Sequence, residues 1–147
     1  MYKIGLYIKM QKTYIKYIDD DQDAVINEVN LQKIASEHGL APIVIYSDYE
    51  SYIVMEKIDG MNLADKYGDK MRNIPRRIRN QILDILWELY TYAGIEYVDV
   101  TPYNFIEKDG IVWIIDFGHA RIADEDMDPY LAKIFTSWKL SWNPKFK

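Results

Sequence analysis

The sequence contains no cysteine, which excludes disulfide bonds, thiol nucleophiles and cysteine-based zinc sites. It has only two histidines, His38 and His119, so a histidine-rich metal site is not expected. No apolar run is long enough to span a membrane, and the N-terminus lacks a signal-peptide core. The formal net charge is −5, which argues against nucleic acid as the default partner. These absences predict a soluble, cytoplasmic protein without a membrane partner.

The composition that remains is that of a globular protein. Of the 147 residues, 49% are hydrophobic and 14% are aromatic, which is enough for a sizeable core in one compact unit. Short alternating segments are mixed with helical patterns along the chain. We therefore expect a single α+β domain covering residues 1–147.

One stretch of the sequence concentrates chemically active side chains. Asp99 and Asn104 lie five positions apart in a polar loop that contains a proline, and Asp116 ends a strongly apolar run. Asp109-Gly110 between two apolar runs predicts a β-hairpin, because a tight type I′ turn needs positive φ. The hairpin would bring Asn104 close to Asp116. A general base, an amide and a carboxylate in this order suit phosphoryl transfer.

The first part of the chain has the pattern of a sheet with one helix. Tyr2–Met10 and Thr13–Ile18 are predicted to form a hairpin around Gln11-Lys12. A helix is expected over residues 22–38, with Asp19-Asp20-Asp21 supplying its N-cap and Gly39 ending it. Pro42–Tyr46 and Ser51–Glu56 are predicted as two further strands.

Helical periodicity predicts that Glu28 faces inward. It shares a stripe with Ala24, Leu31 and Ala35, and an inward carboxylate needs a cationic partner. Lys16, on the preceding strand, is the candidate. The alternatives are that Glu28 lies solvated at the edge of the stripe and that Lys16 is an exposed strand lysine.

The second half is predicted to be mostly helical. We expect a short helix over Asn62–Tyr67, a long helix from Pro75 to Gly94 and a last helix over Tyr130–Leu140. The expected inward residues are Ile78, Ile82, Ile85, Leu86, Leu89 and Ala93 in the long helix, and Leu131, Ile134, Phe135 and Trp138 in the last one. Trp142–Lys147 is expected to pack back on the domain. Arg72, Arg76, Arg77 and Arg79 form a basic cluster that could bind an acidic partner or RNA, or could be a solvated helix face.

The spacing of Asp99 and Asn104, followed by Asp116-Phe117-Gly118, resembles the catalytic and metal-binding loops of the protein-kinase-like superfamily. The resemblance implies a minimal two-lobed kinase-like fold, with an N-lobe over residues 1–57 and a reduced C-lobe with a catalytic hairpin over 58–147. It implies Asp99 as the catalytic carboxylate, and Asn104 and Asp116 as ligands of Mg²⁺ or Mn²⁺. Thr-Tyr-Ile-Lys ending at Lys16 is similar to the kinase strand whose lysine, paired with a glutamate such as Glu28, holds the ATP phosphates.

The segment Val54–Gly60 resembles the kinase hinge. In this reading Met55 is the gatekeeper, and the backbone of Glu56 and Ile58 meets the adenine edge of ATP. The assignment depends on the resemblance alone, and an ordinary strand-to-helix linker is the alternative.

The family pattern is incomplete. No glycine-rich loop precedes Lys16, where only Gly5 is available, and Val98 replaces the arginine before the catalytic aspartate. No A-P-E motif follows Gly118. These departures look more like atypical members such as the RIO kinases and the kinase-like subunit of the KEOPS complex.

The resemblance implies an ATP-dependent phosphotransferase, possibly autophosphorylating, that acts on a protein or small-molecule hydroxyl. The missing glycine loop and reduced C-lobe leave two alternatives open. One is a pseudokinase or interaction module, and the other is an ATPase that acts within a complex.

Overall fold

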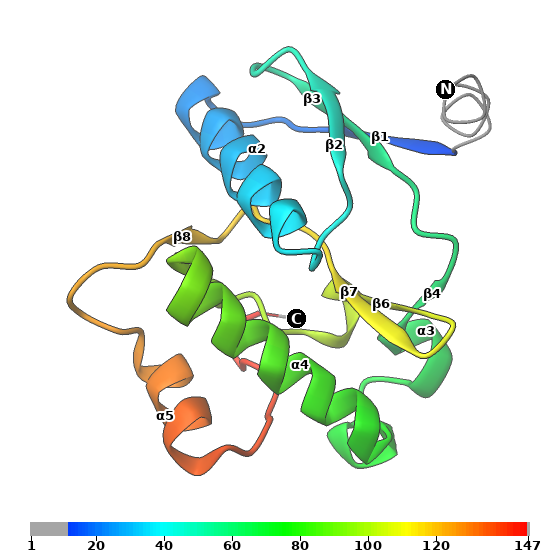
Figure 1. Cartoon of the computed structure of the whole chain (residues 1–147), viewed down its shortest axis with the longest axis vertical. Helices are drawn as coiled ribbons and strands as arrows, with labels where there is room; N and C mark the ends of the chain where they lie inside the picture. Colours follow the sequence, from blue (N-terminus) through cyan, green and yellow to red (C-terminus); the bar gives the residue numbers. More distant parts are fainter. Residues whose placement is uncertain (1–11, 147) are drawn as a thin grey trace.

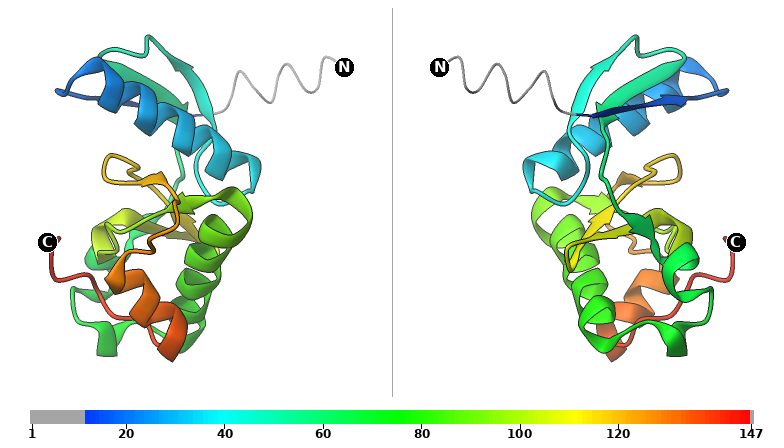
Figure 2. Two further views of the ribbon diagram at one scale, coloured as in Figure 1. Left: turned by 90° about the vertical axis from the view of Figure 1, so that its left-hand side faces the viewer. Right: turned by 90° about the vertical axis from the view of Figure 1, so that its right-hand side faces the viewer.

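The computed structural model describes residues 12–146, and their elements gather in an upper and a lower group (Figures 1 and 2). The predicted boundary at residues 57 and 58 falls in the single connection between β3 and β4. The predicted strand Tyr2–Met10, with Gly5, and the turn residue Gln11 lie outside the described residues. The small antiparallel sheets and the helices give a mixed α and β architecture, as predicted.

The upper group is an antiparallel sheet with one helix beside it. The strands β1 (Thr13–Tyr17), β2 (Val44–Ser47) and β3 (Tyr52–Glu56) are arranged in the order β1-β3-β2. The helix α2 (Gln22–Glu37) begins as predicted, because the N-cap Asp21 accepts a hydrogen bond of 2.8 Å from the Ala24 N–H. The register pairs Lys16, the next-to-last residue of β1, with Ile53 of β3.

A small core joins α2 to the sheet. It consists of Val25 and Val29 from the helix and Ile53 and Met55 from β3. The buried face of α2 is wider than the predicted stripe, because Val25 and Val29 pack on the sheet while Leu31 and Ala35, which the stripe includes, pack on the lower group. Ala24 was predicted to lie on the buried face, but it is only half-buried.

The lower group is organised around α4 (Arg76–Glu88), which continues through a π-helical turn, Leu89–Ala93, and stops at Gly94 with φ of 68°. Before it come β4 (Met61–Asn62), α3 (Leu63–Tyr67) and a 3₁₀ turn at Met71–Asn73. The predicted inward residues of α4 are buried in the large core, whereas Ala93 is only half-buried against it. The stop follows the prediction, because glycine adopts the left-handed conformation without steric cost.

The predicted hairpin is present as β6 (Phe105–Lys108) and β7 (Ile111–Ile114). Its turn residues Asp109 and Gly110 have φ of 52° and 81°, which are the positive values that the sequence predicted. β4 adds to the outer side of β6. The two-residue strands β5 (Ile95–Glu96) and β8 (Arg121–Ile122) pair separately and tie the segment after Gly118 to the end of α4.

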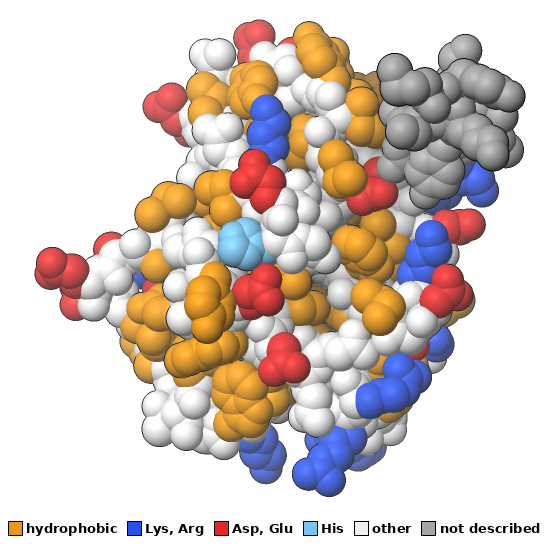
Figure 3. Space-filling view, in the orientation of Figure 1, with side chains coloured by type: hydrophobic (Ala, Val, Ile, Leu, Met, Phe, Trp, Pro, Cys, Tyr) orange, Lys and Arg blue, Asp and Glu red, His pale blue; other side chains and the backbone are white. Residues whose placement is uncertain are grey.

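The last helix, α5 (Pro129–Ser137), is shorter than predicted, and the expectation that Trp138 turns inward is wrong. Trp138 is the C-cap residue with φ of 51°, so its side chain leaves the helical stripe and is 45% exposed. Hydrophobic side chains gather on the surface over α5 (Figure 3). The described part of the tail, residues 142–146, packs back on the domain as predicted, with Asn143 buried and Trp142 packed against the large core.

The described residues bear on two predictions, the basic cluster and the absence of a membrane span. Arg77, from the basic cluster, forms an ion pair with Glu107 of β6, with 3.3 Å between Nη2 and Oε2. Part of the cluster therefore links α4 to the hairpin. Among the helices of residues 12–146, none combines the length and apolar character required to cross a bilayer.

Candidate active site

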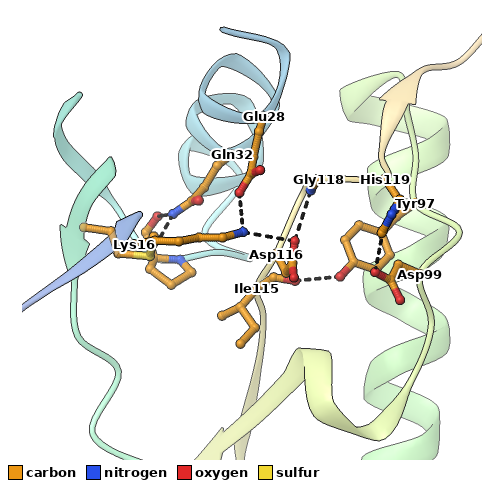
Figure 4. A network of polar contacts seen from close by, with 11 residues as sticks. Lys16, Glu28, Gln32, Tyr97, Asp99, Ile115, Asp116, Gly118 and His119 are labelled. Carbon is orange, nitrogen blue, oxygen red and sulfur yellow. Dashed lines mark hydrogen bonds and ion pairs between the residues drawn. The ribbon is translucent and has the colours of Figure 1, made fainter. Parts of the chain in front are cut away.

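Lys16 contacts both Glu28 of the upper group and Asp116 of the lower group, and so connects the two groups of elements (Figure 4). Its Nζ atom lies 2.5 Å from Glu28 Oε2 on α2 and 3.1 Å from Asp116 Oδ1 after β7. The Glu28 side chain is only 5% exposed, and a buried carboxylate needs a cationic partner such as this lysine. The structure therefore brings together the pair that periodicity and charge predicted and adds Asp116 to it.

Electrostatics keep Lys16 charged. Burial alone would lower the pKa of Lys16, but the carboxylates of Asp116 and Glu28 outweigh this effect and raise it above its ordinary value. The ammonium group therefore keeps its charge, and the Lys16 side chain is 25% exposed on its remaining side.

Asp116 is held in an uncommon backbone conformation. Its φ is 64°, in the left-handed region that non-glycine residues rarely adopt. Its Oδ1 atom also accepts a hydrogen bond of 3.1 Å from the Gly118 N–H, which favours this turn. A Cβ atom on Gly118 would lie 3.2 Å from Asp116 Oδ1 and 3.3 Å from Glu28 Oε1, so glycine permits the close approach. Such local strain concentrates at functional sites.

Tyr97 holds the backbone just after β7 in place, a role that sequence reasoning missed. Its buried hydroxyl donates a hydrogen bond of 2.6 Å to the carbonyl of Ile115, directly before Asp116. Burial and the nearby carboxylates of Asp116, Asp99 and Glu28 hold the pKa of Tyr97 well above its ordinary value. The hydroxyl thus remains a neutral donor.

Asp99 and Asn104 are brought together by the loop between β5 and β6. The Asn104 side-chain amide donates a hydrogen bond of 2.9 Å to the Asp99 carbonyl, and the Asn104 carbonyl accepts one of 3.0 Å from the Ile115 N–H. The second bond extends the hairpin by one pair and places Asn104 next to the strand end that carries Asp116. The predicted proximity of Asn104 and Asp116 follows from this pairing.

A cavity of about 360 Å³ opens between the two groups of elements. Its wall contains six of the predicted site residues, namely Lys16, Met55, Glu56, Ile58, Asn104 and Asp116. Glu28 and Asp99 are not part of the wall. Glu28 contacts it through Lys16, and the Asp99 backbone carbonyl contacts it through the side chain of Asn104. A cavity of this size with few polar groups is typical of a small-molecule site.

The predicted hinge lies along one side of this cavity. The Ile58 carbonyl accepts a hydrogen bond of 2.9 Å from the Gly60 N–H, and the Glu56 N–H donates one of 2.9 Å to the Ile43 carbonyl. Behind it, buried Gln32 donates to the Pro42 carbonyl at 3.0 Å and lies 3.4 Å from the sulfur of Met55. The roles of Met55, Glu56 and Ile58 toward adenine remain predictions.

Comparison with known proteins places the chain in a family. The model of the RIO domain matches residues 12–133, which is most of the chain. This chain belongs to the RIO domain family. Its membership of the protein-kinase-like superfamily, expected from Asp99 to Gly118, is thereby confirmed.

Curated relatives agree with this assignment. A probable serine/threonine-protein kinase of Dictyostelium discoideum is 29% identical over 86% of this chain and 8% of its own length. Another from Streptomyces coelicolor is 33% identical over 61% of this chain and 15% of its own length. The chain thus spans less than a fifth of the relatives it matches. They support a kinase-like phosphotransferase in general terms.

The donor set of this RIO domain fits a magnesium ion that is shared with a nucleotide. Mg²⁺ in phosphoryl-transfer sites is held by one or two protein oxygens together with substrate phosphates and water. Asn104 and Asp116 would supply two such groups on one cavity wall, and the bond from the Asn104 amide nitrogen would leave its Oδ1 as the atom that faces the metal. Within residues 12–146, no three His, Cys, Asp or Glu side chains gather to hold a metal by themselves.

His119 is the other functional candidate that sequence reasoning missed. It follows Gly118 directly, and its Nδ1 atom lies 2.9 Å from Asp99 Oδ2 (Figure 4). The available signal was its place next to the Asp-Phe-Gly motif. Nothing in the spacing indicated that its ring would turn back toward Asp99.

Proposed function

We propose that this RIO domain is an ATP-dependent phosphotransferase that uses Mg²⁺ or Mn²⁺ and transfers phosphate to a hydroxyl acceptor. The observation that carries the proposal is the position of Lys16. It lies between a buried carboxylate and Asp116, and it faces a cavity that Asn104 also lines. A structural ion pair alone would not require a carboxamide and a second carboxylate at the same wall.

In this function each side chain has one task. Lys16, held by Glu28, binds the α- and β-phosphates of ATP, while the backbone of Glu56 and Ile58 contacts adenine next to Met55. Asn104 and Asp116 hold the metal ion, which neutralises charge on the phosphates when it is bound.

Asp99 acts on the acceptor. As the acceptor oxygen bonds to the γ-phosphorus, the bond from that phosphorus to the β-phosphate bridging oxygen breaks and ADP leaves. The proton of the acceptor hydroxyl passes to the Asp99 carboxylate. The Asp99 side chain is only 11% exposed, which favours a small acceptor group that can reach it.

Labelled ATP tests this proposal. The full chain is incubated with γ-labelled ATP and Mg²⁺, and labelled protein, labelled added acceptors and free phosphate are measured together. Asp99→Asn is compared with wild type, and Asp69→Asn, at an exposed loop position, is the control. We expect Asp99→Asn to lower turnover by about a hundredfold or more with ATP binding retained, because general-base catalysis contributes about that much.

The low exposure of the Asp99 side chain also favours a second candidate, in which water is the acceptor and the domain is an ATPase. Free phosphate without any labelled acceptor would support that candidate. Equal turnover by wild type and Asp99→Asn would contradict the role of Asp99. No shift in thermal stability over a range of ATP and Mg²⁺ concentrations would favour an interaction module.

A further inference from the structure

The carboxylate of Asp99 has a fixed partner at one of its two oxygens. His119 Nδ1 lies 2.9 Å from Asp99 Oδ2. A carboxylate only accepts hydrogen bonds, so the ring nitrogen that faces it must carry the proton. The bond occupies Oδ2, leaves Oδ1 as the oxygen available to an acceptor hydroxyl, and restricts rotation of the carboxylate.

The backbone around Asp99 is held by a segment far away in the sequence. The buried Asn143 donates from its side chain to the Val98 carbonyl at 2.9 Å and from its backbone N–H to the Val100 carbonyl at 2.9 Å. These two carbonyls flank Asp99 on both sides. Asn143 therefore fixes the direction in which the Asp99 side chain leaves the loop.

The same segment also contacts the histidine. The Phe146 ring packs on the His119 ring with centroids 5.0 Å apart and an interplanar angle of 48°, which is a favourable aromatic geometry. The Phe146 N–H donates to the Asn143 carbonyl at 3.1 Å, so the two contacts belong to one short turn. Because the His119 side chain is 61% exposed, the contact with Phe146 adds to the bond with Asp99 in limiting its motion.

We propose that His119 is a positioning residue for Asp99, and that the turn Asn143–Phe146 holds both residues in the orientation needed for phosphoryl transfer. This inference rests on the proposed function. In general, misplacing a reacting group by about 1 Å lowers a rate by about a hundredfold, so a fixed carboxylate is worth a comparable factor.

Three variants test the proposal in the labelled-ATP assay. His119→Leu removes the donor and should lower kcat by about ten- to a hundredfold, with the KM for ATP unchanged. His119→Asn places an amide N–H where Nδ1 stood, so it should remain within a few-fold of wild type. Phe146→Leu keeps the donor but removes the aromatic contact, and its kcat should fall between these two. His38→Leu changes the other histidine, which contacts Glu88 on α4, and serves as the control.

A second measurement does not depend on turnover. Nuclear magnetic resonance of the imidazole nitrogens reports which nitrogen carries the proton. We expect the Nδ1–H form of His119 in wild type at a pH where the ring is neutral. Asp99→Asn and Phe146→Leu should both lower its fraction.

The outcomes separate this inference from the proposed function. If wild type transfers no phosphate, the proposed function fails, and the proton position then decides by itself whether His119 holds Asp99. The inference is overturned if His119 carries its proton on Nε2 in wild type. It is also overturned if His119→Leu is as active as or more active than wild type, or if His119→Asn is no better than His119→Leu.

Discussion

Replacing Lys16 with methionine, alone and together with a second substitution, distinguishes the contribution of Lys16 to stability from its contribution to ATP binding. Lys16→Met leaves Glu28, with a side chain only 5% exposed, without its cation. Removing one partner of a buried ion pair costs about 3–5 kcal/mol. Because the Lys16 side chain is 25% exposed, we expect the low end, about 3 kcal/mol in the free energy of unfolding at pH 7.

A second substitution should reverse this loss. In Lys16→Met/Glu28→Leu the buried charge is gone, and apolar replacements of an ion pair are often close to neutral. The double variant should therefore be more stable than Lys16→Met by about 2 kcal/mol. It should still fail to bind ATP, because Lys16 is absent. Asp116, with a side chain 41% exposed, remains hydrated in both variants.

Urea unfolding and a thermal-shift titration with ATP and Mg²⁺ measure the two effects on the same proteins. Lys133→Met, at an exposed position of α5, is the matched control and should change neither. Two results would refute the reasoning: a Lys16→Met protein as stable as wild type, or a double variant less stable than Lys16→Met. ATP binding that survives Lys16→Met would remove the phosphate-holding role.

The remaining predictions concern the support of the hairpin. Burial would raise the pKa of Glu107, but hydrogen bonds from Tyr67, Lys66 and Arg77 outweigh it and lower the pKa below its ordinary value of 4.5. Its charged form therefore stabilises the fold above pH 4.5, and this contribution disappears as the pH falls through the lower, folded-state pKa. The difference in unfolding free energy between wild type and Glu107→Gln should stay constant from neutral pH to about 5 and shrink below 4.5; a difference that grows there would contradict the assignment. Gly60→Ala should lower the free energy of unfolding by about 1–3 kcal/mol, because its Cβ would lie 2.4 Å from the Glu107 backbone oxygen. Urea unfolding measures this change, and an unchanged midpoint of the unfolding transition would show that the close contact relaxes.

The parts of the molecule that follow local rules could be predicted from the sequence. Asp109-Gly110 specified the hairpin because its turn needs positive φ. Helical spacing turned Glu28 inward, and charge burial then required Lys16. Both arguments concern residues that lie in the same helix or strand or in two helices or strands that follow each other closely along the chain.

The contacts that sequence reasoning missed join residues that lie far apart in the sequence. Tyr97 meets Ile115, His119 turns back to Asp99, and Asn143 binds the loop around position 99. No periodicity encodes such contacts. Trp138 was placed wrongly because the apolar spacing continues past Ser137, where a left-handed C-cap ends the helix. The roles of the site residues stay predictions that the variants above test.

Calorimetric titration with a non-hydrolysable ATP analogue tests the central claim most directly, because it asks only whether the cavity at Lys16 binds a metal–nucleotide complex. We predict one binding site per chain in the presence of Mg²⁺. Its affinity should fall at least tenfold when Mg²⁺ is removed by chelation or when Asp116 is changed to alanine, since a charge-assisted contact contributes about 1.5–3 kcal/mol. No binding in the presence of Mg²⁺, or binding that is equal with and without the metal and Asp116, would contradict the account.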